Sequence, residues 1–248
     1  MDLQIIPKKL SGAVTPPPSK SQAHRLLIAA ALSGGVSVLH GLADSQDIQA
    51  TRRCLSALGA GMEDLPDGGL RVHGLGHGIV MAPPYALLDC GESGATLRFL
   101  IPVALLVQGE ASFTGRGRLM ERPLKPYEDL FREKGVAWKL EDHILTVNGG
   151  RGYDALALDS GAYRLPGNVS SQFFTGLLFA LPLLNGDSIL VSTTPLESRD
   201  YLEMTRQALA AAGVTTRWAD ENTLCVPGGQ AYQPFTATAE ADWSQAGF

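Results

Sequence analysis

The distribution of apolar and polar residues along the chain repeats three times. Each copy begins with a long, almost uninterrupted apolar stretch that Ser opens and Gly closes, at residues 21–35, 93–109 and 170–186. Such stretches are predicted to be helices, because hydroxyl side chains cap helix starts and Gly commonly ends helices. A helix that is apolar on every face is buried, so we expect these three helices in the interior.

The rest of each copy also has a constant order. A short β-branched strand is predicted after each apolar helix, then an amphipathic helix, then two strands in a hairpin, most clearly at 136–150 and 214–229. The unit is therefore βαβαββ-like, and the predicted fold is α/β, with three such units whose buried helices are surrounded by sheets. In the third copy the amphipathic helix has apolar residues at helical spacing, among them Tyr201, Met204, Leu209 and Ala212.

Two sets of glycines keep the same register through the copies. The apolar helices are expected to end at Gly35, Gly109 and Gly186, at intervals of 74 and 77 residues. The amphipathic helices are expected to end at Gly59, Gly135 and Gly213, at intervals of 76 and 78 residues. Self-similarity at a fixed period indicates a repeat architecture.

A fourth copy begins near the end of the chain. A step of 73 residues from Ser171 reaches Ser244, where SQAGF is similar to the SQFF at 171–174. The chain ends at Phe248, in the first turn of what would be another buried helix. Because that helix would leave its apolar face unpaired, we expect the chain to be truncated, an expectation that the coding sequence beyond residue 248 tests.

Composition and charge narrow the class of protein. The 248 residues are 45% hydrophobic and 18% charged, which allows a large core and argues against disorder. A net charge of −5 provides no general attraction to nucleic acid or to an acidic membrane. The longest apolar stretch, 173–184, is too short to span a bilayer, and the N-terminus lacks the apolar core of a signal peptide. We therefore expect a cytoplasmic protein.

The sequence contains no motif typical of a metal site or of a nucleotide-cofactor site. Cys54, Cys90 and Cys225 have no metal-binding spacing and are expected to be buried thiols in a reducing cytosol. The sequence contains neither GxxxxGK[ST] nor GxGxxG, and its five histidines show no ligand spacing. We expect no cofactor and no metal. His24, on an otherwise apolar helix, is expected to be packed or capping rather than catalytic.

Four polar clusters carry the candidate chemistry: PPPSKSQAHR (16–25), DCGESGATLR (89–98), TGRGRLMERPLKP (114–126), and LPGNVSSQFF (165–174) together with ESRDY (197–201). Free backbone N–H groups and the dipole of a helix start favour an anion, and Lys and Arg beside them add charge. Arg in the third cluster suits bidentate recognition of carboxylate or phosphate. These clusters predict a site for a phosphorylated metabolite.

Each cluster has a structural alternative. The first and fourth could be ordinary helix caps, with Ser19 or Ser21 capping in the first. For the second, a tight turn with a surface Arg98 is the favoured interpretation. The third, with Arg116, Arg118, Arg122 and Lys125 opposed only by Glu121, favours a function.

The chain resembles the 5-enolpyruvylshikimate-3-phosphate (EPSP) synthase family, also called 3-phosphoshikimate 1-carboxyvinyltransferase. The resemblance rests on the combination, order and spacing of five motifs: PPPSKSQAHR, SGATLR, RLMERPLKP, PGNVSSQFF and ESRDY. The resemblance covers the whole chain. It implies a two-domain fold with three βαβαββ units in each domain. Residues 15–232 would then form a complete substrate-binding domain, with 1–14 and 233–248 as stubs of a second domain.

The resemblance also implies an activity, in which the enolpyruvyl group of phosphoenolpyruvate is transferred to the 5-hydroxyl of shikimate 3-phosphate and phosphate is released. The implied ligands of shikimate 3-phosphate are Ser21, Arg25, Ser170, Ser171, Gln172, Ser198 and Tyr201. The implied contacts of phosphoenolpyruvate are Lys20, Gly94, Arg122 and, again, Gln172. The other loop cations, Arg116, Arg118 and Lys125, are not assigned to either substrate.

The chain departs from this family pattern at its end. The acid–base carboxylate and further cations would lie beyond Phe248, in the missing C-terminal domain, so we expect the fragment to bind weakly and to be inactive. Two alternatives remain. A non-catalytic module that binds a phosphorylated metabolite is one. The other, less favoured, is an enolpyruvyl transferase acting on UDP-N-acetylglucosamine, which typically uses a Cys where this chain has GRGRLMERP.

Overall fold

The computed structural model describes residues 11–76, 86–150 and 158–243. Its first unit contains α1 (Lys20–Ala31), β1 (Val36–His40), α2 (Gln46–Ala57), β2 (Gly61–Asp64) and β3 (Leu70–His73). The second contains β4 (Leu87–Asp89), α3 (Gly94–Gln108), β5 (Glu110–Thr114), the short 3-10 helix η1 (Leu119–Glu121), α4 (Lys125–Glu133), β6 (Ala137–Glu141) and β7 (Ile144–Asn148). The third contains β8 (Ala162–Leu165), α5 (Ser171–Ala180), the 3-10 helix η2 (Leu181–Leu183), β9 (Ser188–Ser192), α6 (Arg199–Ala211), β10 (Arg217–Trp218) and β11 (Thr223–Val226). The last described strand is β12 (Thr236–Thr238).

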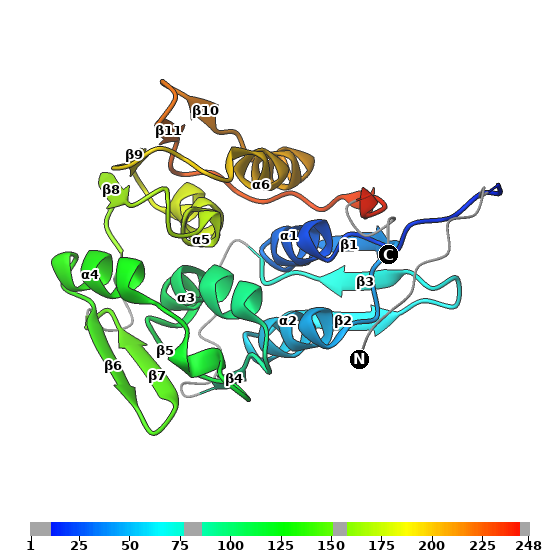
Figure 1. Cartoon of the computed structure of the whole chain (residues 1–248), viewed down its shortest axis with the longest axis horizontal. Helices are drawn as coiled ribbons and strands as arrows, with labels where there is room; N and C mark the ends of the chain where they lie inside the picture. Colours follow the sequence, from blue (N-terminus) through cyan, green and yellow to red (C-terminus); the bar gives the residue numbers. More distant parts are fainter. Residues whose placement is uncertain (1–10, 77–85, 151–157, 244–248) are drawn as a thin grey trace, which may run out of the picture.

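Three four-stranded sheets confirm the predicted α/β repeat. Their strand orders are β12-β1-β3-β2, β4-β5-β7-β6 and β8-β9-β11-β10. In each sheet the first two strands are parallel and the other pairings are antiparallel. The three sheets thus share one topology, as expected for three copies of one unit (Figure 1).

The apolar helices α1, α3 and α5 form the interior, as predicted. Every residue of α1 from Ala23 to Ala31 is buried, and α3 and α5 are buried over nearly their whole lengths. Figure 1 shows the three helices close together, with a sheet on the outer side of each unit. The starts of these helices are consequently brought close to one another, and the sheets fix their directions.

The glycines end the amphipathic helices as predicted but end only one of the apolar helices. Gly59, Gly135 and Gly213 follow α2, α4 and α6 with φ of +109°, +78° and +75°. Among the apolar helices, Gly109 caps α3, whereas α1 and α5 end before Gly35 and Gly186. A Cβ at Gly35 would lie 2.7 Å from Pro234 Cγ, and one at Gly186 would lie 2.6 Å from Ser160 Oγ. Close packing rather than helix capping therefore requires these two glycines.

The residues that gave α6 its apolar periodicity are only partly buried. Leu209 and Ala212 are buried, but Tyr201 is 46% exposed and Met204 is half-buried. The inward face of the helix instead carries Leu202, Thr205, Ala208 and Leu209. Sequence periodicity cannot distinguish a core face from a face that borders a cavity, because both contain apolar residues.

Residues 236–238 close the first sheet. β12 runs parallel to β1, with Val38 opposite Thr236. Next to it, Ser19 N donates to Glu240 O at 2.8 Å and Asp242 N donates to Pro17 O at 2.7 Å. This stretch lies within 233–248, which the sequence analysis assigned to a second domain, yet its strand supplies the edge of the first sheet. Ser244 and the expected fourth copy lie outside the described residues.

The cysteines differ from the expectation in one respect. Cys54 and Cys90 are buried, but Cys225 is half-exposed because it alternates along β11 with the buried Leu224 and Val226. No helix within the described residues is long and apolar enough to cross a membrane.

Candidate active site

One pocket gathers most of the residues selected from sequence. Its volume is about 300 Å³, and it lies where the first turns of α1, α3, α5 and α6 meet. The residues that line it are Ser21, His24, Arg25, Ala95, Phe99, Val169, Ser170, Ser171, Gln172, Ser198 and Tyr201. All seven residues expected to contact shikimate 3-phosphate are among them.

The starts of α5 and α6 supply hydroxyl groups and free N–H groups to this pocket. Ser170 caps α5, its Oγ accepting a hydrogen bond from Gln172 N at 3.3 Å. Ser171 is the first residue of α5, and its side chain lies at the pocket wall. Ser198 occupies the cap position of α6 but makes no side-chain cap, which leaves its hydroxyl available. Two helix starts at one pocket favour an anion there.

Arg25 places a buried positive charge at the same pocket. The residue is only 2% exposed, and its guanidinium donates to Thr205 Oγ1 at 2.8 Å, Ser21 O at 2.6 Å, Tyr201 O at 3.1 Å and Thr175 Oγ1 at 3.3 Å. All four acceptors are uncharged, and no ion pair joins Arg25 to a described residue. Burial lowers the pKa of Arg25 to about 10. A buried cation without a counter-ion is costly, so an anionic ligand would complete the site.

Arg98 is not the surface residue that the sequence favoured. It is half-buried, lies over the Phe173 ring at 5.1 Å, and donates from Nη1 to Gln172 Oε1 at 2.7 Å. Burial and the nearby Arg122 lower the pKa of Arg98. Because Arg98 occupies the amide oxygen of Gln172, the amide nitrogen of Gln172 remains available as a donor. The sequence placed Arg98 one turn into a helix but could not show which residue of another unit it would contact.

Gly94 and Arg122 lie next to each other at the start of α3. A Cβ on Gly94 would come within 2.6 Å of Arg122 Nη1, so only glycine leaves room for the guanidinium in this position. The two residues expected to contact phosphoenolpyruvate through the second and third clusters are therefore neighbours, and Arg98 connects this region to Gln172.

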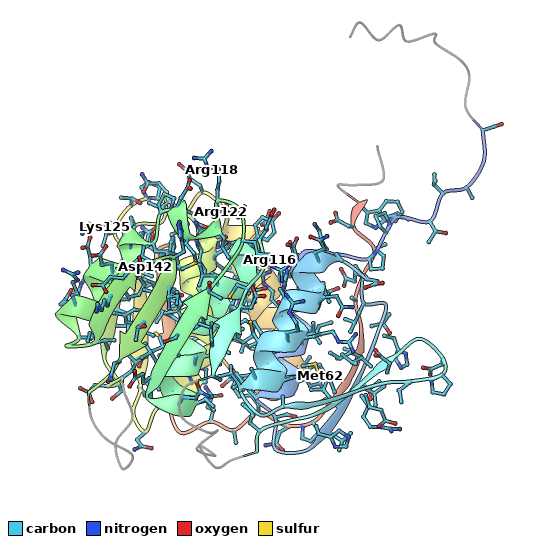
Figure 2. All side chains as sticks on the ribbon, turned by 90° about the horizontal axis from the view of Figure 1, so that it is seen from below. Met62, Arg116, Arg118, Arg122, Lys125 and Asp142 are labelled. Carbon is cyan, nitrogen blue, oxygen red and sulfur yellow. The ribbon has the colours of Figure 1, made fainter. Side chains whose placement is uncertain are left out.

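The remaining cations of the Arg-rich loop have acidic partners. Arg116 pairs with Asp89 at 3.4 Å, Arg118 with Glu121 at 2.8 Å, and Lys125 with Asp129. Figure 2 shows these side chains, with Arg122, spread over one side of the molecule. Arg122 has no ion pair with any described residue. The loop therefore contains one cation free for a ligand and three cations that are already paired.

Lys20 is not among the residues that line the pocket. Its Nζ lies 3.3 Å from Asp47 Oδ2, and its side chain is 42% exposed. The structure thus places Gly94 next to Arg122, and Arg98, which is near Arg122, is hydrogen-bonded to Gln172. Lys20 is paired with Asp47 of α2 instead. Ser19, rather than Ser21, caps α1 by accepting from Gln22 N at 3.3 Å, so Ser21 is available to the pocket.

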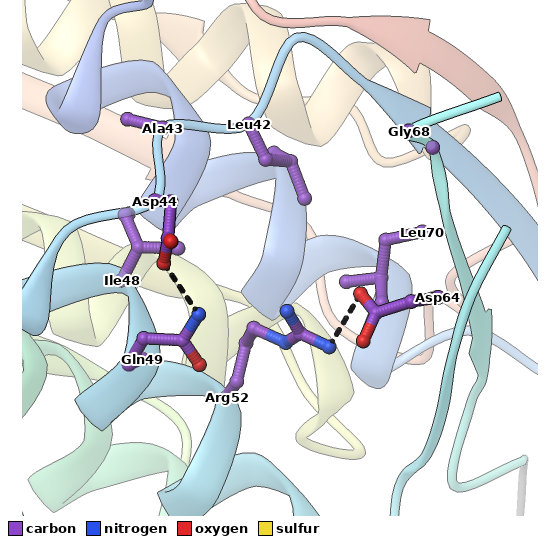
Figure 3. Close-up of a pocket in the computed structure, with 10 residues that line it drawn as sticks. Leu42, Ala43, Asp44, Ile48, Gln49, Arg52, Asp64, Gly68 and Leu70 are labelled. Atoms are coloured by element: carbon purple, nitrogen blue, oxygen red, sulfur yellow. Dashed lines mark hydrogen bonds and ion pairs between the residues drawn. The ribbon is translucent and has the colours of Figure 1, made fainter. Parts of the chain in front are cut away.

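A second pocket, of about 280 Å³, lies between α2 and the β2–β3 hairpin. Figure 3 shows that its polar side chains pair with each other: Gln49 donates to Asp44 at 2.9 Å and Arg52 contacts Asp64 at 2.9 Å. None of the residues selected from sequence lines it. Because its charges already have partners, it offers no comparable site for an anion.

Several residues of the first pocket carry no recognisable signal in the sequence. Ala95 and Phe99 of α3 and Val169 before α5 form apolar parts of its wall, and no polar motif marked them. Nor did a motif mark Thr175 and Thr205, which hold the guanidinium of Arg25. The only hint of them in the sequence is a threonine hydroxyl on a helix face whose other residues are apolar.

The fold and the pocket together define a class of protein: α/β proteins of repeated βαβαββ units in which the starts of several helices converge on one pocket. Comparison with known proteins agrees with this class and identifies the family. The chain belongs to the EPSP synthase (3-phosphoshikimate 1-carboxyvinyltransferase) family, whose model matches residues 5–248.

Similar proteins extend the comparison. The chain is 41% identical to a 3-phosphoshikimate 1-carboxyvinyltransferase of Clostridium perfringens and 43% identical to one of Clostridium kluyveri, over 98% and 99% of its own length. It spans 56% of the length of each of these relatives. The solved EPSP synthase of Acinetobacter baumannii has the same fold, with a TM-score of 0.77 at 23% identity, over 94% of this chain and 50% of that one.

Proposed function

We propose that the pocket binds shikimate 3-phosphate and that the protein takes part in transferring the enolpyruvyl group of phosphoenolpyruvate to the 5-hydroxyl of that substrate, releasing phosphate. The observation that carries the proposal is the convergence of all seven expected ligands on one pocket. That pocket also contains Arg25, which is buried and has no ion pair with any described residue. Family membership supports the same reaction.

The site residues have separate roles in this proposal. Arg25 and Ser21 face an anionic group of shikimate 3-phosphate at one wall. Ser170 and Ser171, with the free N–H groups of α5, face another. Both substrates are polyanions, so a preformed set of donors lowers the cost of bringing them together and orienting them.

Phosphoenolpyruvate is assigned to the neighbouring region. This substrate would contact Gly94, Arg122 and Gln172. Lys20 would contact it as well, after breaking its ion pair with Asp47. In the reaction, C3 of phosphoenolpyruvate gains a proton while the 5-hydroxyl oxygen adds to C2 and loses its proton. The tetrahedral intermediate then expels phosphate and returns a proton from C3, which restores the double bond.

Proton transfer requires a group that the pocket does not contain among its described residues. None of the eleven lining residues is Asp or Glu, and burial lowers the pKa of His24 to about 4. We propose that the acid–base carboxylate belongs to the part of the relatives' length that this chain does not span. In this proposal residues 15–232 form the substrate-binding domain, and residues 1–14 and 233–248 belong to a second domain, with β12 pairing with β1 of the first. By itself the 248-residue chain would bind substrate without turnover.

The cellular location is part of the same proposal. The three free cysteines, two of them buried, are compatible with a reducing compartment. We place the protein in the cytoplasm.

Calorimetric titration with shikimate 3-phosphate tests the proposal. Removing a hydrogen bond to a charged group costs about 1.5–3 kcal/mol, so Ser171→Ala should weaken binding roughly 10- to 100-fold. Arg118→Ala, which removes an exposed cation paired with Glu121, is the matched control and should bind like the unaltered chain.

The alternatives give different results in the same experiment. If shikimate 3-phosphate gives no heat of binding, the non-catalytic module remains. If UDP-N-acetylglucosamine gives heat instead, the enolpyruvyl transferase acting on that substrate is favoured. None of the three cysteines lines the pocket, which counts against that second alternative. Turnover by the purified chain would contradict the need for a further carboxylate.

A further inference from the structure

His24 is placed to contact a ligand in the pocket, although the proposed reaction assigns it no role. It lies on α1 between Ser21 and Arg25, is 4% exposed, and lines the pocket. Its ring meets Phe99 edge-on, with the ring centroids 6.2 Å apart and an interplanar angle of 89°. Packing against Phe99 therefore fixes the ring plane.

A buried chain of hydrogen bonds fixes the tautomer of this imidazole. His24 Nδ1 lies 2.7 Å from Thr51 Oγ1, which lies 2.7 Å from Thr96 Oγ1. Thr96 Oγ1 donates in turn to Ser93 Oγ at 2.7 Å. Each hydroxyl has one hydrogen to donate. Asp47 O lies 3.4 Å from both threonine hydroxyls and is the more distant acceptor. With Thr96 donating to Ser93, the short contacts assign Thr51 as the donor to Thr96 and Nδ1 of His24 as the donor to Thr51.

This direction leaves Nε2 of His24 with a lone pair. No hydrogen bond joins Nε2 to any described residue, and Nε2 is not among the fully enclosed polar atoms that lack a partner. Burial lowers the pKa of His24 to about 4, so the ring is neutral near pH 7. The other polar groups of the pocket wall, which include serine hydroxyls, a guanidinium and backbone N–H groups, are mostly able to donate hydrogen bonds to an anion. A neutral acceptor among them is suited to a ligand group that donates, which a hydroxyl does and a phosphate dianion does not.

We propose that Nε2 of His24 accepts a hydrogen bond from one of the two free ring hydroxyls of the bound substrate, and thereby selects a hydroxylated ring. This inference rests on the proposed function, which supplies shikimate 3-phosphate as the ligand. Sites that hydrogen-bond a substrate hydroxyl discriminate strongly against the analogue without it, because the site's polar atom is then left unpaired.

The test compares shikimate 3-phosphate with its 4-deoxy and 5-deoxy analogues by calorimetry. The unaltered chain should bind the parent roughly tenfold more tightly than one of the two analogues. His24→Phe retains the contact with Phe99 but has no acceptor. It should bind the parent and that analogue equally, at the weaker affinity, and the analogue concerned identifies the hydroxyl.

Thr51→Val provides a second variant outside the pocket. It keeps the shape of Thr51 but removes the acceptor of the Nδ1 hydrogen, so the tautomer of His24 is no longer fixed. The preference for the parent should fall in this variant as well. If His24→Phe does not fold, Thr51→Val alone decides, and an unchanged preference there would contradict the inference.

A purely structural role of His24 gives a different pattern. In that case His24→Phe would weaken all three ligands by the same factor, and the inference would be wrong while the proposed function stood. If the unaltered chain bound all three ligands with equal affinity, the inference would again be wrong and the proposed function would stand. Failure of the unaltered chain to bind shikimate 3-phosphate would overturn the proposed function and this inference together.

Discussion

At the scale of single residues, the pocket combines a buried cation with polar groups that have no acidic partner. Arg25 is held by hydroxyl and carbonyl oxygens alone, which orient its guanidinium without neutralising it. Arg122 likewise has no acidic partner among the described residues, whereas Arg116 and Arg118 do. Arg25 and Arg122 therefore differ from Arg116 and Arg118 in their partners, as the proposal that the first two bind a ligand requires.

The pH dependence of stability should report the burial of His24. Burial is the main cause that lowers its pKa from 6.5 to about 4, and Asp47 opposes it. The unfolded chain takes up this proton near pH 6.5 and the folded chain only near pH 4. The free energy of unfolding should therefore fall as the pH falls through this window, by roughly 3 kcal/mol in total from this residue. Urea unfolding at several pH values, with His24→Phe for comparison, measures this contribution; identical pH profiles of the two proteins would contradict it.

A methyl group at Gly94 should act on Arg122. Its Cβ would lie 2.6 Å from Arg122 Nη1, so Gly94→Ala must displace the guanidinium. With shikimate 3-phosphate already bound, we expect phosphoenolpyruvate to bind about tenfold more weakly, since a hydrogen bond to a charged group is lost. Affinity for shikimate 3-phosphate alone should be unchanged, and an equal loss for both ligands would show that the substitution disturbs the pocket as a whole.

At the scale of elements, the ends of the helices determine where the chemistry lies. α5 and α6 present their starts to the pocket, and the glycines after α2, α4 and α6 turn the chain back into its hairpins. These glycines have positive φ, a conformation that costs other residues about 1 kcal/mol or more.

Gly135 offers a clean measure of this conformational cost. Its φ is +78°, and a Cβ there would meet no atom within 4 Å, so backbone strain is the only expected effect. Gly135→Ala should lower the free energy of unfolding by about 1 kcal/mol, measured by urea denaturation. Gly135→Asn is the control and should lose less, because Asn tolerates the left-handed conformation better. Equal losses in the two variants would argue against backbone strain.

At the scale of the whole molecule, the residues just before α1 and β1 itself meet the last described residues of the chain. β12 lies along β1, and Pro18 forms an antiparallel bridge with Ala241 (Figure 1). The first sheet is thus completed by residues from the far end of the sequence. The position of the α1 start, which carries Ser21 and Arg25, depends on this closure because Ser19 N donates to Glu240 O.

Removing the closing strand should therefore affect both stability and binding. A chain ending at residue 232 loses β12 and exposes the edge of β1. We expect it to be less stable by about 3 kcal/mol, from several backbone hydrogen bonds of about 1 kcal/mol each, and to bind shikimate 3-phosphate more weakly. A chain ending at residue 243 is the control, and equal melting temperatures of the two would contradict a structural role for β12.

Much of the fold could be predicted from sequence because the relevant patterns are local. Apolar stretches opened by Ser predicted the buried helices α1, α3 and α5, and Gly59, Gly135 and Gly213 predicted where α2, α4 and α6 end. Gly35 and Gly186 were misinterpreted because close packing against a distant residue also requires glycine. The seven expected ligands were identified by family resemblance, and their convergence on one pocket required the structure.

The sequence by itself determined the three-unit repeat, the buried helices and the polar helix starts, since each follows from spacing within a single element. Only the tertiary structure decided which residues meet. Arg25 and Thr205, 180 residues apart, are hydrogen-bonded, and Phe235 N donates to Ser37 Oγ across 198 residues. No periodic pattern in the sequence predicts such contacts, because they arise when separate units pack against each other. The same packing places His24 at the pocket wall, on a helix whose sequence indicates only burial.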